Sequence, residues 1–246
     1  MKNTILAISL AAALGSVGSA NAAFVDTTAG GFNGNIQFSG TISDPAPIWA
    51  FEIPDATKNG VKNWNVNKSD GVASGSNTTF SFSTKPTYTL IHGFMKTTAR
   101  IGGPGLTPEI KVGKVGSEVK LDGTEQVVNI DATDTASSSN VKGSLSFKAI
   151  GYIGGAYYDA ATPKYFGSVK AQQVLSTNRA DFNTAYPSVA AGTSTFAQAE
   201  TLMASTSSQK VSGAYTVDIK DYSLTFPTAT IPTSWEATVP VVVTLK

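Results

Sequence analysis

Residues 32–42 read Phe32-Asn33-Gly34-Asn35-Ile36-Gln37-Phe38-Ser39-Gly40-Thr41-Ile42, and apolar or glycine positions alternate with polar ones throughout. Successive side chains of a strand point to opposite faces, so this segment would have one apolar and one polar face. The apolar face holds Phe32, Gly34, Ile36, Phe38, Gly40 and Ile42. The segment therefore predicts a β-strand that buries one face.

The C-terminal residues 235–246 alternate in the same way, with Val242 as the apolar exception on the polar face. Pro240 has no N–H to donate to a neighbouring strand, so a sheet edge or a bulge is expected there. The apolar face consists of Trp235, Ala237, Val239, Val241, Val243 and Leu245. A second one-sided strand is therefore predicted at this end.

Between these segments, short alternating runs are separated by turn signals such as Ser69-Asp70-Gly71 and Leu121-Asp122-Gly123. This texture is typical of an all-β sandwich or barrel. The glycine-rich residues 151–155 are interpreted as a turn or bulge. The clearest expected strands cover residues 48–53, 79–83, 88–91, 109–112, 126–130, 144–149, 215–219 and 222–226.

One region has helical rather than strand spacing. Phe196, Ala199, Leu202 and Met203 recur one helical turn apart between residues 195 and 205, among Ala, Gln and Glu. A short helix is predicted here, inside an insertion around residues 165–210. Insertions in a β framework carry function more often than the framework does.

The first 22 residues have the three parts of a secretory signal peptide. Lys2 supplies the positive charge, an apolar run extends from Ile5 to Val17, and small residues at Ala20 and Ala22 precede the expected cleavage site. The apolar run is shorter than the ~20 residues of a membrane-spanning helix. We therefore expect an exported protein whose mature chain starts at Ala23.

Composition argues against several function classes. The 18 Lys and Arg balance the 17 Asp and Glu, and no basic face for nucleic acid is expected. The chain has no cysteine and one histidine, His92, which alone makes neither a triad nor a metal site. Asp131 and Asp134 are interpreted as part of a solvated loop. No enzymatic activity, metal or cofactor is expected.

Three parts of the chain resemble the FaeG-type major fimbrial subunits, cysteine-free pilins of the chaperone–usher pathway in Gram-negative bacteria. They are residues 31–42 followed by Ile48-Trp49-Ala50-Phe51, residues 142–149 and residues 234–243. The resemblance implies an all-β fold, an incomplete immunoglobulin-like β-sandwich completed by donor-strand exchange. A small helical insertion would be added to it.

The resemblance also implies how the chain is divided. Residues 23–44 would be a donor-strand extension whose apolar face, Phe32 to Ile42, fills a groove in the next subunit by β-strand addition. Residues 45–246 would be the pilin domain, with the face from Trp235 to Leu245 forming a groove wall and the chaperone-contact strand. The implied partners are neighbouring subunits in a homopolymer, a periplasmic chaperone and an outer-membrane usher. The implied location is an extracellular surface fimbria, reached through the periplasm.

In FaeG-type fimbriae the major subunit also binds host glycoconjugates, so the resemblance allows an adhesive role here. The candidate receptor surface is Tyr157, Tyr158 and Tyr165, because aromatic rings stack on sugars. Core packing is the more frequent role of such residues. Whether the chain is a major or a minor subunit stays open.

Two other classes remain as alternatives. A small outer-membrane β-barrel shares the signal peptide and the alternating strands. However, the expected strands are shorter than the ~9 to 11 residues that span a membrane. A secreted glycan-binding module or glycosidase with a complete sandwich would instead be a stable monomer that needs no chaperone.

Overall fold

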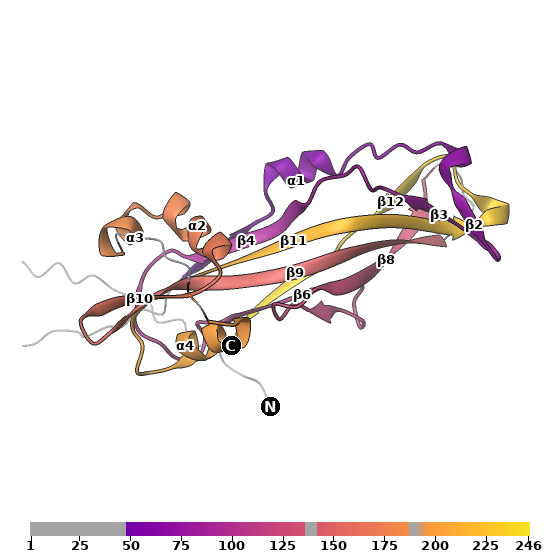
Figure 1. Ribbon diagram of the computed structural model, residues 1–246. Coiled ribbons are helices and arrows are strands. Elements are labelled where there is room, and N and C mark those ends of the chain that lie inside the picture. The colour runs from indigo at the N-terminus through magenta and orange to yellow at the C-terminus, as the bar shows by residue number, and fades with distance from the viewer. Residues whose placement is uncertain (1–47, 136–141, 187–191, 193) are drawn as a thin grey trace, which may run out of the picture. The chain divides into compact units, whose positions relative to one another are not determined.

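Figure 1 shows a computed structural model of the chain, which describes residues 48–135, 142–186, 192 and 194–246. The chain divides into two units, Met1–Ser43 and Asp44–Lys246, and all described residues belong to the second unit. The expected signal peptide and donor segment therefore lie outside the described residues.

The second unit consists mainly of antiparallel strands. The strands are β1 (Trp49–Glu52), β2 (Val72–Ser74), β3 (Asn77–Ser81), β4 (Tyr88–Met95), β5 (Ala99–Ile101), β6 (Pro108–Val112), β7 (Val119–Lys120), β8 (Gln126–Asp134), β9 (Lys142–Asp159), β10 (Thr162–Gly167), β11 (Gln209–Pro227), β12 (Trp235–Ala237) and β13 (Val241–Leu245). The helices are α1 (Asp55–Gly60), α2 (Val169–Asn178), α3 (Ala180–Ala185) and α4 (Phe196–Ala204), with short 3-10 turns at Lys68–Asp70 and Thr228–Thr230.

The larger sheet has the order β1-β4-β11-β9-β8-β12, and the paired strands β9 and β11 run through its centre. The sequence indicated two short strands near residues 215–219 and 222–226, but both belong to β11, with a register shift between Lys220 and Ser223. The glycine-rich residues 151–155, interpreted above as a turn or bulge, lie inside β9. That interpretation was wrong because a Cβ at Gly154 or Gly155 would collide with the backbone of Ser168 or Ser212, so these glycines serve close packing inside the strand.

The smaller sheet has the order β13-β6-β7, and the C-terminal segment joins the two sheets. Its first part, β12, pairs with β8, and its second part, β13, pairs with β6. The strand is interrupted between them at residues 238–240, where Pro240 predicted an irregularity. Buried side chains from β6, β8 and β9 pack in one apolar core: Ile110, Val112, Val128, Ile130 and Phe147.

The helical insertion lies at one end of β9 and β11. Figure 1 shows α2 and α3 on one side of this end and α4 on the other. Helix α4 is the helix that the sequence predicted, and a capping box between Thr195 and Gln198 begins it. Helices α2 and α3 were not predicted. The fold class is thus confirmed as an all-β sandwich with a small helical insertion.

Candidate functional site

The apolar face of the C-terminal segment is only half-buried. Trp235, Ala237, Val239, Val241 and Val243 contact the core, but all five remain partly exposed, and Leu245 is 45% exposed. The neighbouring strand β6 differs, because Ile110 and Val112 are completely buried. The core is therefore incompletely covered along β12 and β13, the segment we call the C-terminal edge.

Hydrogen bonds satisfy one side of this edge along its whole length. The ladder starts where Thr135 N donates to Ser234 O and continues through β12 with β8 and β13 with β6. Gly113 N donates to Pro240 O across the interruption, over 3.1 Å, and Lys246 N donates to Thr107 O. On the other side, no strand among the described residues pairs with β12 or β13. This leaves a row of backbone groups that an added strand can use.

Strand β1 is also at a sheet edge and has half-buried apolar side chains. The rings of Trp49 and Phe51 stack with centroids 5.3 Å apart, and Trp49 Nε1 donates to Leu106 O over 3.1 Å. Ile48, just before β1, is 62% exposed. The uncovered part of the apolar core therefore includes aromatic groups from the N-terminal side of the described chain.

A hollow of about 360 Å³ lies between the loop around residues 65–70 and the end of β3. Asn65, Val66 and Phe82 are among its lining residues. The ring centroid of Phe82 lies 6.0 Å from that of Trp235. Most of the remaining lining is polar, so Phe82 is the link between this hollow and the apolar face of the C-terminal edge.

The other end of the C-terminal edge is fastened by an ion-pair cluster. The Glu109 carboxylate on β6 contacts the ammonium of Lys246, and also those of Lys120 at 3.4 Å and Lys111 at 3.5 Å. The hydrogen bond from Lys246, reinforced by Lys120, lowers the pKa of Glu109 to about 2. The charged form of Glu109 therefore stabilises the folded chain.

This cluster predicts an acid-dependent loss of stability. Since the folded-state pKa is below the usual value of 4.5, the contribution of Glu109 is complete above pH 4.5 and disappears as pH falls toward 2. We expect Glu109→Gln to lower Tm at pH 7 and to flatten the fall of Tm over this range. Thermal unfolding at several pH values measures this. Glu236→Gln, at an exposed residue without an ion pair among the described residues, is the control and should keep the wild-type profile.

The three sets of site residues predicted from the sequence lie in different parts of the chain. The donor set, Phe32, Gly34, Ile36, Phe38, Gly40 and Ile42, lies outside the described residues. The acceptor set from Trp235 to Leu245 forms the C-terminal edge. The three tyrosines do not share one face: Tyr157 packs against Phe166, whereas Tyr158 and Tyr165 contact Tyr186 in a separate cluster near α2 and α3.

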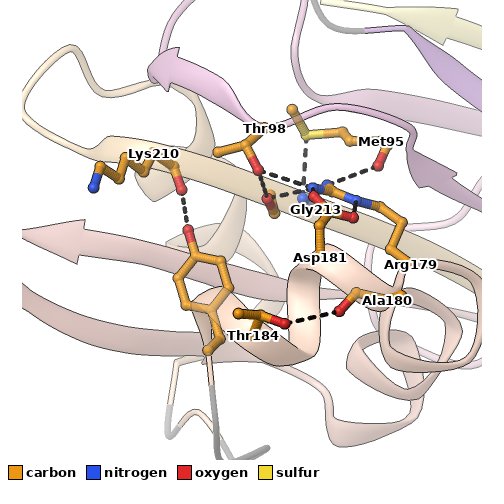
Figure 2. Close-up of polar contacts among 10 residues, drawn as sticks. Met95, Thr98, Arg179, Ala180, Asp181, Thr184, Lys210 and Gly213 are labelled. Carbon is orange, nitrogen blue, oxygen red and sulfur yellow. Dashed lines mark hydrogen bonds and ion pairs between the residues drawn. The ribbon is translucent and has the colours of Figure 1, made fainter.

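Sequence reasoning missed Arg179, which is 4% exposed between α2 and α3. Figure 2 shows its guanidinium among groups from several elements. Nη1 donates to Met95 O (3.0 Å) and Ser212 Oγ (3.2 Å), Nη2 donates to Thr98 Oγ1 (2.9 Å), and Asp181 forms an ion pair with it. An Arg-x-Asp sequence in an otherwise uncharged Ala- and Asn-rich stretch was the available signal.

A family model described as "Fimbrial, major and minor subunit" matches residues 1–151 of the chain. The chain belongs to this fimbrial subunit family. The match confirms the FaeG-type resemblance. This fimbrial subunit is therefore a structural component of an extracellular surface fimbria. A comparison with curated proteins found no match.

Within residues 48–135, 142–186, 192 and 194–246, no helix is long and apolar enough to cross a membrane. In the same part of the chain, no group of three or more His, Asp or Glu residues is arranged to hold a metal ion.

Proposed function

We propose that this fimbrial subunit polymerises by donor-strand exchange, with residues 23–44 of one copy pairing with the C-terminal edge of the next. The observation that carries the proposal is the half-buried apolar face of β12 and β13. This face lies beside backbone groups to which no described strand is bonded. An incoming strand would cover the apolar face and pair with the open backbone groups.

The donor segment matches this edge in pattern. Its large apolar residues, Phe32, Ile36, Phe38 and Ile42, alternate with polar residues, as the covering of a single face requires. Each contributes ~1.5 to 3 kcal/mol when fully buried. Gly34 and Gly40 suit positions where the groove is shallow. Added backbone hydrogen bonds would make the joint dissociate slowly.

The proposal implies protection of the edge during export. An apolar edge with open backbone groups pairs readily with other chains and promotes aggregation. A periplasmic chaperone that covers β12 and β13 would prevent this, and an outer-membrane usher would exchange it for the next donor strand. The resulting fibre is a homopolymer on the cell surface.

Moving residues 23–44 to the C-terminus behind a short flexible linker tests the proposal. We expect the rearranged chain to be a monomer with a high, cooperative Tm, because its own strand can now complete the sandwich. The native mature chain, refolded without a chaperone, should aggregate or polymerise. Size-exclusion chromatography and thermal unfolding compare the two. A stable native monomer with a destabilised rearranged chain would contradict the proposal.

Two neighbouring valines provide a sharper comparison on β13. Val243→Asp places a charge on the half-buried face, so we expect fibre formation to be lost. Val242→Asp, at an outward position that is 42% exposed, should leave fibre formation intact. Electron microscopy of cells expressing each variant measures the effect. Equal fibre formation by the two variants would show that this face is not the acceptor.

A further inference from the structure

Residues 102–107, which we call the end loop, connect β5 of the larger sheet with β6 of the smaller one. The loop lies at the helical end, the end of β9 and β11 that carries α2, α3 and α4, because Gly103 N donates to Met203 O of α4 over 3.0 Å. Leu106 and Thr107, at the other end of the loop, are buried. The end loop is therefore fastened on both sides.

The end loop also contacts both edges that border the uncovered part of the core. On β1, Trp49 Nε1 donates to Leu106 O over 3.1 Å. On the C-terminal edge, Lys246 N donates to Thr107 O over 2.9 Å, and Gly105 N donates to Lys246 O. Figure 1 shows the C-terminus near α4, in agreement with these contacts. At the opposite end, no hydrogen bond joins β1 to β12 among the described residues, so the two edges are connected at the helical end alone in this part of the chain.

The open backbone groups of the C-terminal edge belong to its odd-numbered residues. Ser234 O and Pro240 O accept hydrogen bonds from the neighbouring segments, and Lys246 directs its N–H and C=O to the end loop. Successive residues of a strand direct these groups to alternate sides, so the open side receives those of residues 235, 237, 239, 241, 243 and 245. Pro240, which has no N–H, thus lies at a position where the open side loses no donor.

The donor segment has as many core-facing positions as this edge. Phe32 to Ile42 provide six, and Trp235 to Leu245 provide six. Because side chains alternate with a period of two, a slip of one residue would turn the apolar face of the donor away from the core. A slip of two residues keeps every side chain on its face, so alternation alone does not select a single register. A physical stop at one end of the edge would select it.

The residues on either side of the donor's apolar face differ in stiffness. Glycines at residues 30–31 precede this face, whereas Pro45 and Pro47 follow it. Glycine lets a chain turn sharply, whereas proline keeps itself and the residue before it extended. A strand that reaches the end loop must turn aside there, but at the Trp235 end it can continue straight toward the rest of its own subunit. The glycine pair therefore suits the end loop.

We propose that the end loop is a stop that holds Phe32 of an incoming donor opposite Leu245 and thereby fixes the register of the joint. The donor then runs antiparallel to β13, and its last apolar residue, Ile42, lies opposite Trp235. Contacts with α4, β1 and the C-terminal residue hold the loop in place against the entering strand. This inference rests on the proposed function, because its occupant is the donor segment of a second copy.

Cysteine pairs introduced into assembled fibres test the register, since the chain has no cysteine of its own. In the proposed register, Asn33 lies opposite Thr244 and Thr41 lies opposite Glu236. A disulfide needs Cα atoms about 4.4 to 6.8 Å apart, which directly opposite residues satisfy. Fibres with Asn33→Cys and Thr244→Cys, or with Thr41→Cys and Glu236→Cys, are sheared from cells, reduced and then oxidised with oxidised glutathione. We expect a ladder of covalent multimers on a non-reducing gel.

Two mismatched pairs are the controls for this measurement. Asn35→Cys with Thr244→Cys reports a donor that has slipped by two residues past the stop. In the proposed register these Cα atoms are roughly 8 Å apart, so we expect at least fivefold less multimer. Asn33→Cys with Glu236→Cys reports a parallel donor and should give no multimer.

Trp49→Phe tests the role of the loop itself, because it keeps an aromatic ring on β1 but removes the hydrogen bond to Leu106 O. We expect at least a threefold increase in multimers from the slipped pair of residues 35 and 244. The matched control is Trp64→Phe, which also removes an indole hydrogen bond, from Nε1 to Gly60 O over 2.7 Å, but leaves the end loop unchanged. Its multimer yield should equal that of the wild-type background.

Three results would overturn the proposal: equal yields from the matched and slipped pairs, multimers from the parallel pair, or an unchanged slipped-pair yield in Trp49→Phe. Fibres that form but give no multimer with either matched pair would overturn it as well. Electron microscopy of each variant shows whether fibres assemble. If the rearranged chain is a stable monomer while the matched pairs fail, the stop alone is refuted. If the rearranged chain gains no stability, donor-strand exchange itself is refuted.

Discussion

Arg179→Met is expected to lower the free energy of unfolding by about 3 kcal/mol, because hydrogen bonds from a buried charged group are worth ~1.5 to 3 kcal/mol each. The substitution removes donors from Met95 O, Thr98 Oγ1 and Ser212 Oγ. The two hydroxyls retain a hydrogen bond to each other over 2.9 Å, which limits the loss. A decrease in Tm of roughly 6 to 12 °C should follow for a chain of this size.

The measurement uses the rearranged chain, the form that we expect to be monomeric, with urea and thermal unfolding. Arg179 connects the α2–α3 junction to β4 and β11. In the Arg179→Met variant, amide hydrogen exchange should therefore accelerate more in α2 and α3 than in the strands of the sandwich. Asp181→Asn is the companion variant: it keeps the hydrogen-bond donors of Arg179 but removes the carboxylate that pairs with a guanidinium only 4% exposed, so we expect it to be destabilised as well. If Arg179→Met unfolds like wild type, the guanidinium does not fasten the insertion.

Gly155→Ala is expected to be at least as damaging, with a loss of about 3 kcal/mol or more from overpacking. A Cβ on Gly155 would lie 2.9 Å from the Cα of Gly213 and still closer to the carbonyl oxygen of Ser212. Both contacts are with the backbone of β11, which cannot rotate out of the way as a side chain could. The substitution therefore separates β9 from β11, the central strand pair of the fold.

Gly103→Ala is the matched control, because a Cβ there would meet nothing within 4 Å and the backbone does not require glycine. Its Tm should equal or slightly exceed that of wild type, since alanine reduces the entropy of the unfolded chain. Both variants are compared by thermal unfolding of the rearranged chain. Similar Tm values for Gly155→Ala and wild type would mean that β9 and β11 can separate without cost.

The elements that were correctly predicted from the sequence are those in which apolar residues recur at a regular spacing. The C-terminal alternation correctly placed Val241 and Val243 on the half-buried face and Val242 on the exposed one. Helical spacing likewise found α4, whose residues Ala199 and Met203 are completely buried. In both cases a polar and an apolar face are distinct, so position in the sequence determines the direction of the side chain.

Sequence patterns failed where burial does not follow hydrophobicity. Helix α2 buries Gln172, whose Nε2 donates to Phe166 O, so its apolar pattern is incomplete. The glycines in β9 indicate a turn locally, yet a Cβ at Gly154 or Gly155 would collide with backbone at residue 168 or 212. Arg179 has hydrogen-bond partners that are remote in sequence, namely Met95, Thr98 and Ser212. Such contacts are set by tertiary packing, which no local pattern encodes.

The length of β11 has a mechanical consequence. This strand has 19 residues, about 60 Å, and with β9 it extends from the helical end into the sandwich, as Figure 1 shows. A force applied along the strand direction to the end that carries α2, α3 and α4 would load the hydrogen bonds between β9 and β11 in shear. Many bonds then share the force at once, instead of opening one after another as in peeling. The β9–β11 pair would therefore transmit tension between the helical insertion and the rest of the β-sandwich without opening.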